Sequence, residues 1–274
     1  MTVGPRAVHT GAMEPDPAAS APGAAGPDPS ESVPKDPGPK GPAPKGPAPK
    51  GPAPKDHAPK DHGVAALKPR LRGWLHFGAA PLAFVLGLAL MVVTPSEGLR
   101  VAVALYVLTT VLLFGVSSAY HLGAGSARVN AFLRKVDHAN IYLFIAGSYT
   151  PFAAALPDAR LRWTVLALVW GIALVGLIVR VAWTGAPRWL VTGSYIALGW
   201  VAVFFLPAFY RDLGAATVAL LAIGGVLYTI GGVVYALKRP NPHPEWFGFH
   251  ELFHAFTIAA YLVQYVAVAM VVTT

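Results

Sequence analysis

Residues 99–120 read LRVAVALYVLTTVLLFGVSSAY and carry a single charge, Arg100, near the start. An α-helix rises 1.5 Å per residue and needs about 20 apolar residues to cross roughly 30 Å of hydrocarbon. The length and the near absence of charge predict that this stretch crosses a membrane as one helix.

Six similar stretches lie around it, and the breaks between them contain proline and glycine, which end helices and form turns. The seven predicted membrane helices are 74–94, 99–120, 137–156, 162–182, 189–207, 213–237 and 250–272. We therefore expect an all-α polytopic membrane protein, with a seven-helix transmembrane domain over residues 69–274.

The composition supports a membrane protein over a soluble one. Of the 274 residues, 55% are hydrophobic and 12% are charged, whereas soluble domains contain about 25% charged residues. A soluble enzyme or a soluble nucleic-acid-binding protein is disfavoured, despite the formal net charge of +8. The chain contains no cysteine, so a metal site would have to use His, Asp or Glu.

Residues 1–68 differ from the rest. They contain 16 of the 26 prolines and a repeat, KGPAP, that begins at Lys40. Such a segment cannot bury enough apolar surface to offset the entropy of ordering, which predicts a disordered cytoplasmic tail. Its lysines can contact anionic lipid headgroups, although a solvated tail without a partner is the simpler interpretation. His57 and His62 belong to the degenerate end of the repeat and are not predicted to be ligands.

The loop charges predict the orientation. With the tail inside the cell, the inner side of the spans has Arg128, Arg134, Lys135, Arg180, Arg188, Lys238 and Arg239, and the outer side has Arg100, Arg160, Arg162 and Arg211. An excess of Lys and Arg marks the cytoplasmic side. We therefore predict a multi-pass protein of the cell membrane with its N-terminus in the cytoplasm and its C-terminus outside.

Ionisable residues stand at three predicted helix ends on this cytoplasmic side. His121 follows the second span, Asp137 opens the third, and His250 and His254 open the last. An ionisable side chain within a span costs about 2.5–3.5 kcal/mol on insertion scales, so its presence calls for a reason. Residues four apart share one helix face, so His250 and His254 can reach the same point. Ser117, one turn before His121, would face that point too.

These residue types suit a metal ion. Imidazole and carboxylate ligands bind Zn²⁺, and His121, Asp137, His250 and His254 would complete a tetrahedral site. If Asp137 binds through a water, three protein ligands and one exchangeable position remain, as in catalytic zinc sites. Ser117 could then hold a water or a substrate oxygen.

Simpler interpretations exist for each residue alone. A lone histidine at a helix end is more often an interfacial side chain, and His76 fits that description because it has no obvious partner in the sequence. Asp137 could cap the third helix at its positive end, and Ser117 could hydrogen-bond back to its own helix. The convergence of four ligand-type residues at one depth favours the metal site.

Residues 250–254 also match H-E-x-x-H, a zinc metalloprotease signature in which the Glu is the general base. Such proteases take a third ligand downstream, but no His, Asp or Glu follows His254. An ordinary zinc protease is therefore disfavoured, and the role of Glu251 stays open.

Ser117-x-x-x-His121, Asp137 and His250-x-x-x-His254 together resemble the hemolysin III family, the bacterial branch of the progestin and adipoQ receptor family, which is related to alkaline ceramidases. The resemblance covers about residues 70–274. It implies a seven-helix bundle with zinc near the cytoplasmic face, held by the three histidines, with Asp137 binding directly or through water and Ser117 beside it. His138 takes a place where eukaryotic relatives usually have an aromatic residue.

Three functions follow as alternatives. The first is a zinc-dependent hydrolase of amide or ester bonds in membrane lipids, with Asp137 as base or water-orienting group and Ser117 stabilising the oxyanion. The second is a non-enzymatic protein that senses lipids, with structural zinc. The third is a membrane-lytic protein. The expected partners are membrane lipids and not nucleic acid; the lipid and the oligomeric state are left open.

Overall fold

The computed structural model describes residues 69–123, 125–183 and 185–273, so the predicted tail lies outside the described residues. The described chain is helical almost throughout and contains no β-strand. Its elements are α1 (Trp74–Val93), α2 (Glu97–Leu122), α3 (Ala127–Ala154), α4 (Ala159–Ala182), α5 (Arg188–Gly199), the 3₁₀ helix η1 (Trp200–Phe205), α6 (Leu206–Leu213), α7 (Ala215–Leu237) and α8 (Phe249–Thr273). This confirms the predicted all-α membrane fold.

The fifth predicted span differs from its expected bounds. Helices α5, η1 and α6 form one continuous apolar segment, Arg188–Leu213, instead of ending at residue 207. Pro207 lies in the first turn of α6, where the missing N–H needs no partner. The chain breaks instead at Gly214, which has a φ of 87°. The span therefore continues through Pro207 for about two further turns.

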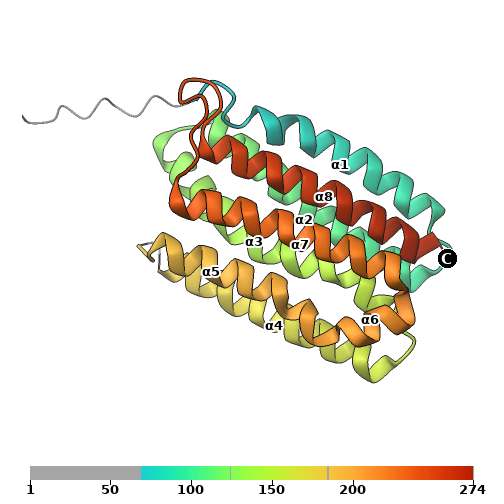
Figure 1. The fold of residues 1–274 in the computed structure, drawn as a ribbon. Helices are drawn as coiled ribbons and strands as arrows, with labels where there is room; N and C mark the ends of the chain where they lie inside the picture. The colour runs from blue at the N-terminus through green and yellow to red at the C-terminus, as the bar shows by residue number, and fades with distance from the viewer. Residues whose placement is uncertain (1–68, 124, 184, 274) are drawn as a thin grey trace, which may run out of the picture. The chain divides into compact units, whose positions relative to one another are not determined.

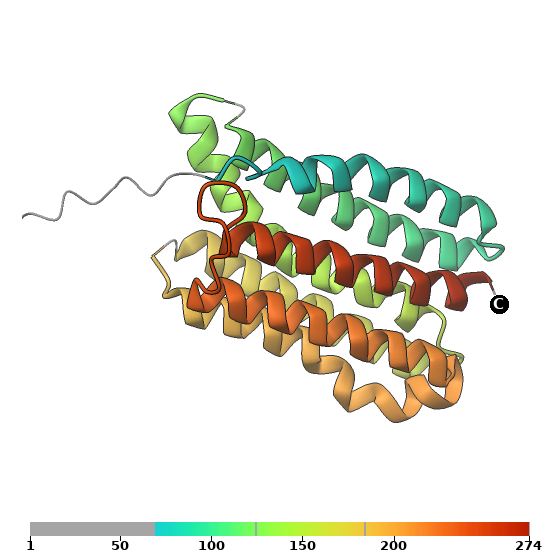
Figure 2. The same cartoon turned by 45° about the horizontal axis from the view of Figure 1, so that its top comes forward.

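Around the bundle, each long helix packs against the next in the order α1, α2, α3, α4, α5, α7 and α8, and α8 also packs against α1 (Figure 1). Figure 2 shows the same neighbourhood of α1 and α8 from a second side. Helix α3 has the most central position, because it contacts α2, α4, α5 and α8. The first and last helices of the described chain are thereby neighbours.

The central position of α3 explains its unusual composition. Within the described residues, six helical segments are long and apolar enough to cross a membrane by length and hydropathy, and α3 is not among them. All residues from 146 to 153 in this helix are buried. Since much of α3 contacts other helices, its side chains need not be uniformly apolar. The helix also begins ten residues before the predicted start at residue 137.

Small residues let the helices approach closely. A Cβ atom at Gly147 of α3 would collide with the Thr109 side chain of α2. A Cβ at Gly87 of α1 would collide in the same way with Val107 of α2. Small residues at interfaces are the usual way in which membrane helices gain packing contacts.

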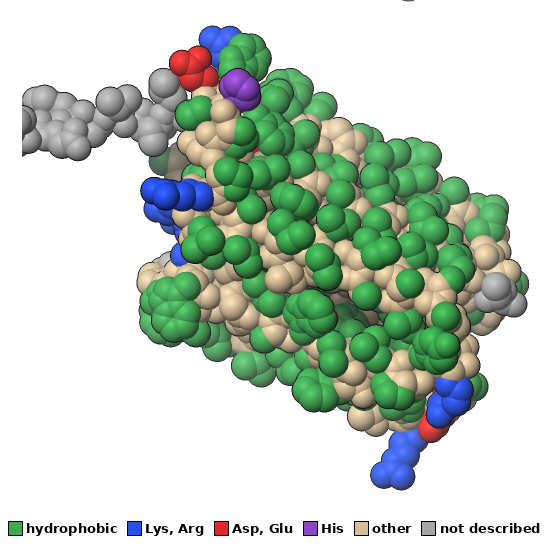
Figure 3. Space-filling model, in the orientation of Figure 1, with side chains coloured by type: hydrophobic (Ala, Val, Ile, Leu, Met, Phe, Trp, Pro, Cys, Tyr) green, Lys and Arg blue, Asp and Glu red, His purple; other side chains and the backbone are tan. Residues whose placement is uncertain are grey.

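The outer surface has the character expected in a bilayer. Large apolar side chains are exposed along the helices, among them Val92 at 84% and Phe204 at 81%. In Figure 3, charged side chains gather at the two ends of the visible face, and the region between them is apolar or uncharged. A soluble monomer rarely exposes apolar patches on this scale, so the surface supports a multi-pass membrane protein.

Candidate metal centre and its cavity

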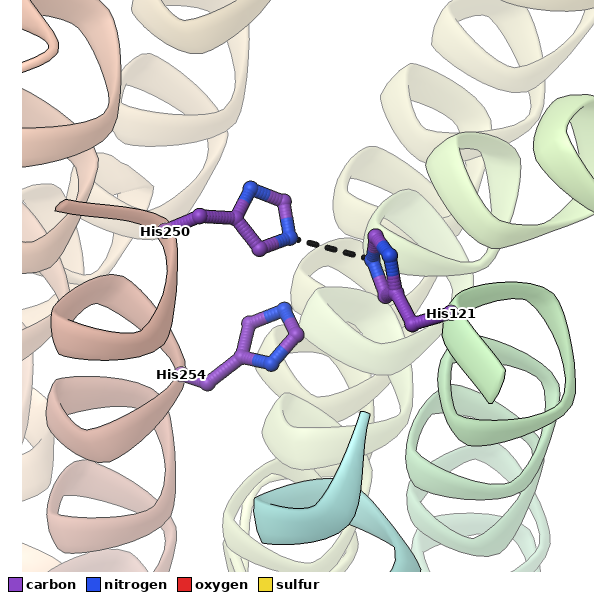
Figure 4. Close-up of side chains that lie close together, drawn as sticks. All are labelled: His121, His250 and His254. Atoms are coloured by element: carbon purple, nitrogen blue, oxygen red, sulfur yellow. Dashed lines mark hydrogen bonds between the residues drawn. The ribbon is translucent and has the colours of Figure 1, made fainter. Parts of the chain in front are cut away.

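Three histidines from two helices meet at one end of the bundle. His121 lies in the last turn of α2, and His250 and His254 lie in the first two turns of α8. One ring nitrogen from each lies within 4.8 Å of the other two. Figure 4 shows the His121 ring facing the two rings of α8, with 3.0 Å between Nε2 of His121 and Nε2 of His250. The convergence predicted for these histidines is present.

The geometry fits a bound cation. Two ligands at about 2.0–2.1 Å from a tetrahedral Zn²⁺ lie roughly 3.3 Å apart, close to the separation of the His121 and His250 nitrogens. His254 is 2% exposed, and its Nδ1 is buried without a hydrogen-bond partner among the described residues. Several transition metals accept imidazole ligands, so the cluster defines a possible metal site without choosing the ion.

Asp137 lies beside this cluster. Its Oδ2 is 3.9 Å from Nε2 of His121, and the three-histidine group does not include it. Ser117, which is 2% exposed, lines the same cavity as Asp137. Asp137 does not cap α3, because the N-cap is Ser126, whose hydroxyl accepts from the N–H of Val129. The roles of Asp137 and Ser117 stay predictions.

His138 is oriented by its own helix. Its Nδ1 donates to the backbone oxygen of Arg134 at 2.7 Å, and its backbone oxygen accepts from the Tyr195 hydroxyl at 2.8 Å. Its Nδ1 also lies 3.9 Å from Oδ2 of Asp137. His138 is therefore a neighbour of Asp137 and not a member of the three-histidine cluster.

Glu251 is turned away from the histidines. It is fully buried, its Oε1 accepts from Nε of Arg72 at 2.8 Å, and its Oε2 accepts from the N–H of Gly248 at 2.9 Å. The second contact is that of a helix-capping carboxylate at the start of α8. Glu251 does not line the cavity beside the histidines. The protease-like role as a general base therefore has no support, and Glu251 fixes the position of α8 instead.

The segment before α1 closes over this end of the site. The N–H of Arg70 donates to Glu245 O at 2.9 Å, and the Arg70 guanidinium lies 4.6 Å from the centre of the Trp246 ring. Gly73 has a φ of 91°, and a Cβ there would lie only 3.0 Å from the His121 Cβ. These contacts, with the Arg72–Glu251 pair, join the start of α1 to the start of α8.

His76 is not an isolated interfacial residue, and that expectation was wrong. It is 3% exposed, and its ring stacks on that of His254 with centres 3.7 Å apart and planes 13° apart. The centre of the Phe114 ring, on α2, lies 4.9 Å from the centre of the His76 ring. Neither ring nitrogen of His76 has a hydrogen-bond partner among the described residues. Sequence spacing gave no signal, because the partner lies on the last helix.

A cavity of about 360 Å³ begins at the histidines and runs into the bundle. At one end it is lined by Ser117, Asp137, His250 and His254, and farther along by apolar side chains such as Phe152. An apolar cavity with a few polar groups at one end is typical of a ligand site. The arrangement can hold an apolar chain with its polar part beside the histidines.

The fold and the site define an all-helical membrane protein with a buried three-histidine cluster. The family model described as "Haemolysin-III related" matches residues 64–265. The chain therefore belongs to the haemolysin III family, as the sequence motifs predicted.

Curated relatives agree with this assignment. The chain is 32% identical over 141 residues to the Hemolysin-3 homolog of Bacillus subtilis (strain 168), covering 51% of this chain and 66% of that one. It is 31% identical over 147 residues to Hemolysin-3 of Bacillus cereus, covering 53% and 67%. An adiponectin receptor protein of Drosophila melanogaster is 24% identical over 215 residues, covering 70% and 48%. The matched segment thus spans about two thirds of the Bacillus proteins.

Proposed function

We propose that this protein is a zinc-dependent hydrolase of amide or ester bonds in membrane lipids and that it contributes to membrane homeostasis. The observation that carries the proposal is the continuity of one cavity from His250, His254, Asp137 and Ser117 to apolar side chains deep in the bundle. A lipid in this cavity would have its acyl chain among apolar groups and its carbonyl carbon near polar ones.

Each residue of the site has a separate role in the proposed reaction. His121, His250 and His254 would hold the ion, which supplies Lewis acidity toward a carbonyl oxygen and makes water more acidic. Asp137 would take the proton of the attacking water while the new carbon–oxygen bond forms. It would then deliver that proton to the leaving amine or alcohol as the old bond breaks. Ser117, which lines the cavity beside Asp137, would orient this carboxylate or turn its hydroxyl toward the oxyanion.

The experiment compares metal content and lipid turnover in the purified full chain. We expect about one zinc per chain and release of fatty acid from a membrane lipid extract, followed by mass spectrometry. Asp137→Asn should keep the metal and lose roughly 10²–10⁴-fold in turnover, the size of a general-base contribution. His254→Ala should lose both. His243→Ala is the control, since His243 is an exposed loop residue outside the cluster.

Retained turnover in His254→Ala would overturn the proposal. A second candidate, a non-enzymatic lipid-sensing protein with structural zinc, is favoured by one observation: the cluster links α2 to α8. It predicts that metal-loaded protein consumes no lipid of any class while metal removal still lowers its melting temperature. The lytic alternative predicts dye release from liposomes, and the same preparation tests it.

A further inference from the structure

We propose that the end of the cavity beside the histidines binds the anionic headgroup of a single-chain lipid through Arg134, Arg180 and Arg188. The inference rests on the proposed function in taking the cavity as the lipid site. It adds the requirement that the lipid headgroup is anionic, and a measurement of lipid binding tests this requirement without any turnover.

The first observation is the charge of the cavity lining. Its charged residues are Arg134, Asp137, Arg180 and Arg188. Three are positive and one is negative. They come from α3, from the last turns of α4 and from the start of α5, so all belong to the end that holds the histidines. The farther lining contains phenylalanines such as Phe152 and Phe209 and no charged residue.

The second observation is that the three arginines converge. All three line the same cavity, together with the His138 ring. Arg188 reaches across to α7, where its guanidinium lies 4.8 Å from the centre of the Tyr235 ring and Nη1 donates to Tyr235 O at 3.4 Å. Arg180 is half-buried. Three cations from three helices thus surround one part of the cavity.

The rule that loop cations set the topology of a membrane protein does not explain why these three arginines line the cavity. Arg128 and Lys135 lie at the same end of the bundle and do not line the cavity. At the other end, Arg162 donates from Nε and Nη2 to Leu156 O at 3.1 and 2.7 Å and stays out of the cavity. Cations at either end of the bundle can therefore stay outside the cavity, as Arg128, Lys135 and Arg162 do.

Physical chemistry then selects the ligand class. Positive charges in a partly desolvated cavity favour an anion, and guanidinium groups bind phosphate or carboxylate through strong charge-assisted hydrogen bonds. The cavity volume of about 360 Å³ is at the low end for ligand sites, which favours one acyl chain over two. The ligand is therefore a single-chain amphiphile with an anionic head, a phosphate or a carboxylate.

The test measures lipid binding in the full-length His254→Ala protein. This change removes one of the three cluster histidines, so that lipid binding can be measured without turnover and without an anion binding to a metal ion. The probes are oleoyl lysophosphatidate and oleoyl lysophosphatidylcholine, which share a chain, and oleate and oleyl alcohol, which form a second pair. In at least one pair, we expect the anionic lipid to bind about tenfold or more tightly than the lipid without a net charge. Preference for lysophosphatidate identifies a phosphate and preference for oleate a carboxylate, and either supports the proposal.

Variants make the test specific. Arg180→Gln and Arg188→Gln should each reduce the preference at least fivefold, whereas Arg128→Gln and Lys135→Gln should change it less than twofold. Arg180→Lys keeps the charge and should keep most of the preference, which separates a charge effect from a folding defect. Equal binding within both pairs, or equal losses in the Arg128 and Lys135 controls, would overturn the proposal. Failure of the hydrolase function would appear separately, as absent turnover in the wild type.

Discussion

Glu251 and Arg72 form a buried ion pair next to the histidine cluster. Glu251 is fully buried, whereas the Arg72 side chain is 24% exposed. Removing one partner of such a pair leaves the other without compensation and typically costs 3–5 kcal/mol. We expect Arg72→Met to lower the free energy of unfolding in detergent by about 3 kcal/mol, measured by denaturant titration.

A double-mutant cycle isolates the pair. Arg72→Met and Glu251→Gln combined should cost less than the sum of the two single changes, because the second change no longer breaks an interaction. Arg128→Met is the control, since Arg128 is an exposed residue at the same end of the bundle. Strict additivity in the cycle would show that the pair contributes nothing.

His76 permits an independent prediction. Its ring is buried against His254 and Phe114, and both of its nitrogens lack partners among the described residues. Replacing unpaired buried polar groups with apolar atoms of similar shape is nearly neutral or stabilising. His76→Phe should therefore keep the melting temperature and the metal content, while His76→Ala should destabilise by about 2–4 kcal/mol through the space it leaves.

The outcome for metal content decides what His76 does. Retained metal in His76→Phe shows that the ring acts by packing against His254. Loss of metal from a folded His76→Phe protein would contradict this and make His76 a ligand. Metal analysis of protein that passes size-exclusion chromatography distinguishes the two.

The cluster residues were predictable from sequence because charge is scarce in the spans. His121 and the pair His250 and His254 stood out against apolar neighbours, and spacing four placed the pair on one face. His76 and Glu251 were not predictable, because what they do depends on contacts across the bundle. Their partners, His254 and Arg72, lie near the opposite end of the sequence, and local pattern holds no signal for such contacts.

At the scale of elements, close helix packing is the feature most open to test. Gly147 lies where a Cβ would collide with Thr109, whereas Gly171 of α4 has no heavy atom within 4 Å of the place where its Cβ would be. Overpacking a tight contact costs about 1–3 kcal/mol, and alanine in an open helix position is favourable relative to glycine. We expect Gly147→Ala to lower the melting temperature and Gly171→Ala to leave it unchanged or raise it.

Equal effects of the two substitutions would contradict the packing argument and indicate a general response to helix propensity. Thermal unfolding of both variants in the same detergent provides the comparison. A compensating change, Thr109→Ala, removes the hydroxyl oxygen that lies nearest to the place of a Cβ at Gly147, together with the methyl group, and should restore part of the stability of Gly147→Ala.

Helix bounds were partly predictable for a physical reason. Span ends marked by loops such as Pro95-Ser96 were expected within a few residues, because turn residues interrupt an apolar run there. The long start of α3 was missed because Arg134 and Lys135 read as a loop, although the helix continues through them. High hydropathy identifies helices that face lipid, whereas much of α3 contacts other helices and therefore has lower hydropathy.

At the scale of the whole molecule, orientation stays a prediction from the loop charges. We expect a reporter at the N-terminus to be active in the cytoplasm and one at the C-terminus to be active outside, measured with paired enzyme fusions. Charge reversal of the cytoplasmic residues outside the cavity, Arg128 and Lys135, should reduce the fraction with this orientation. The opposite reporter pattern would reverse the proposed side of the histidine cluster.

The cluster joins the second helix to the last, and this determines when it can form. Chains emerge from the ribosome with the N-terminus first, so His121 is in place while α8, which carries His250 and His254, is still to be made. The ion pair between Arg72 and Glu251 likewise cannot form until α8 has been synthesised. Synthesis of α8 is therefore the step that completes the cluster, and a chain that ends before α8 has one of the three cluster histidines and lacks the pair on α8.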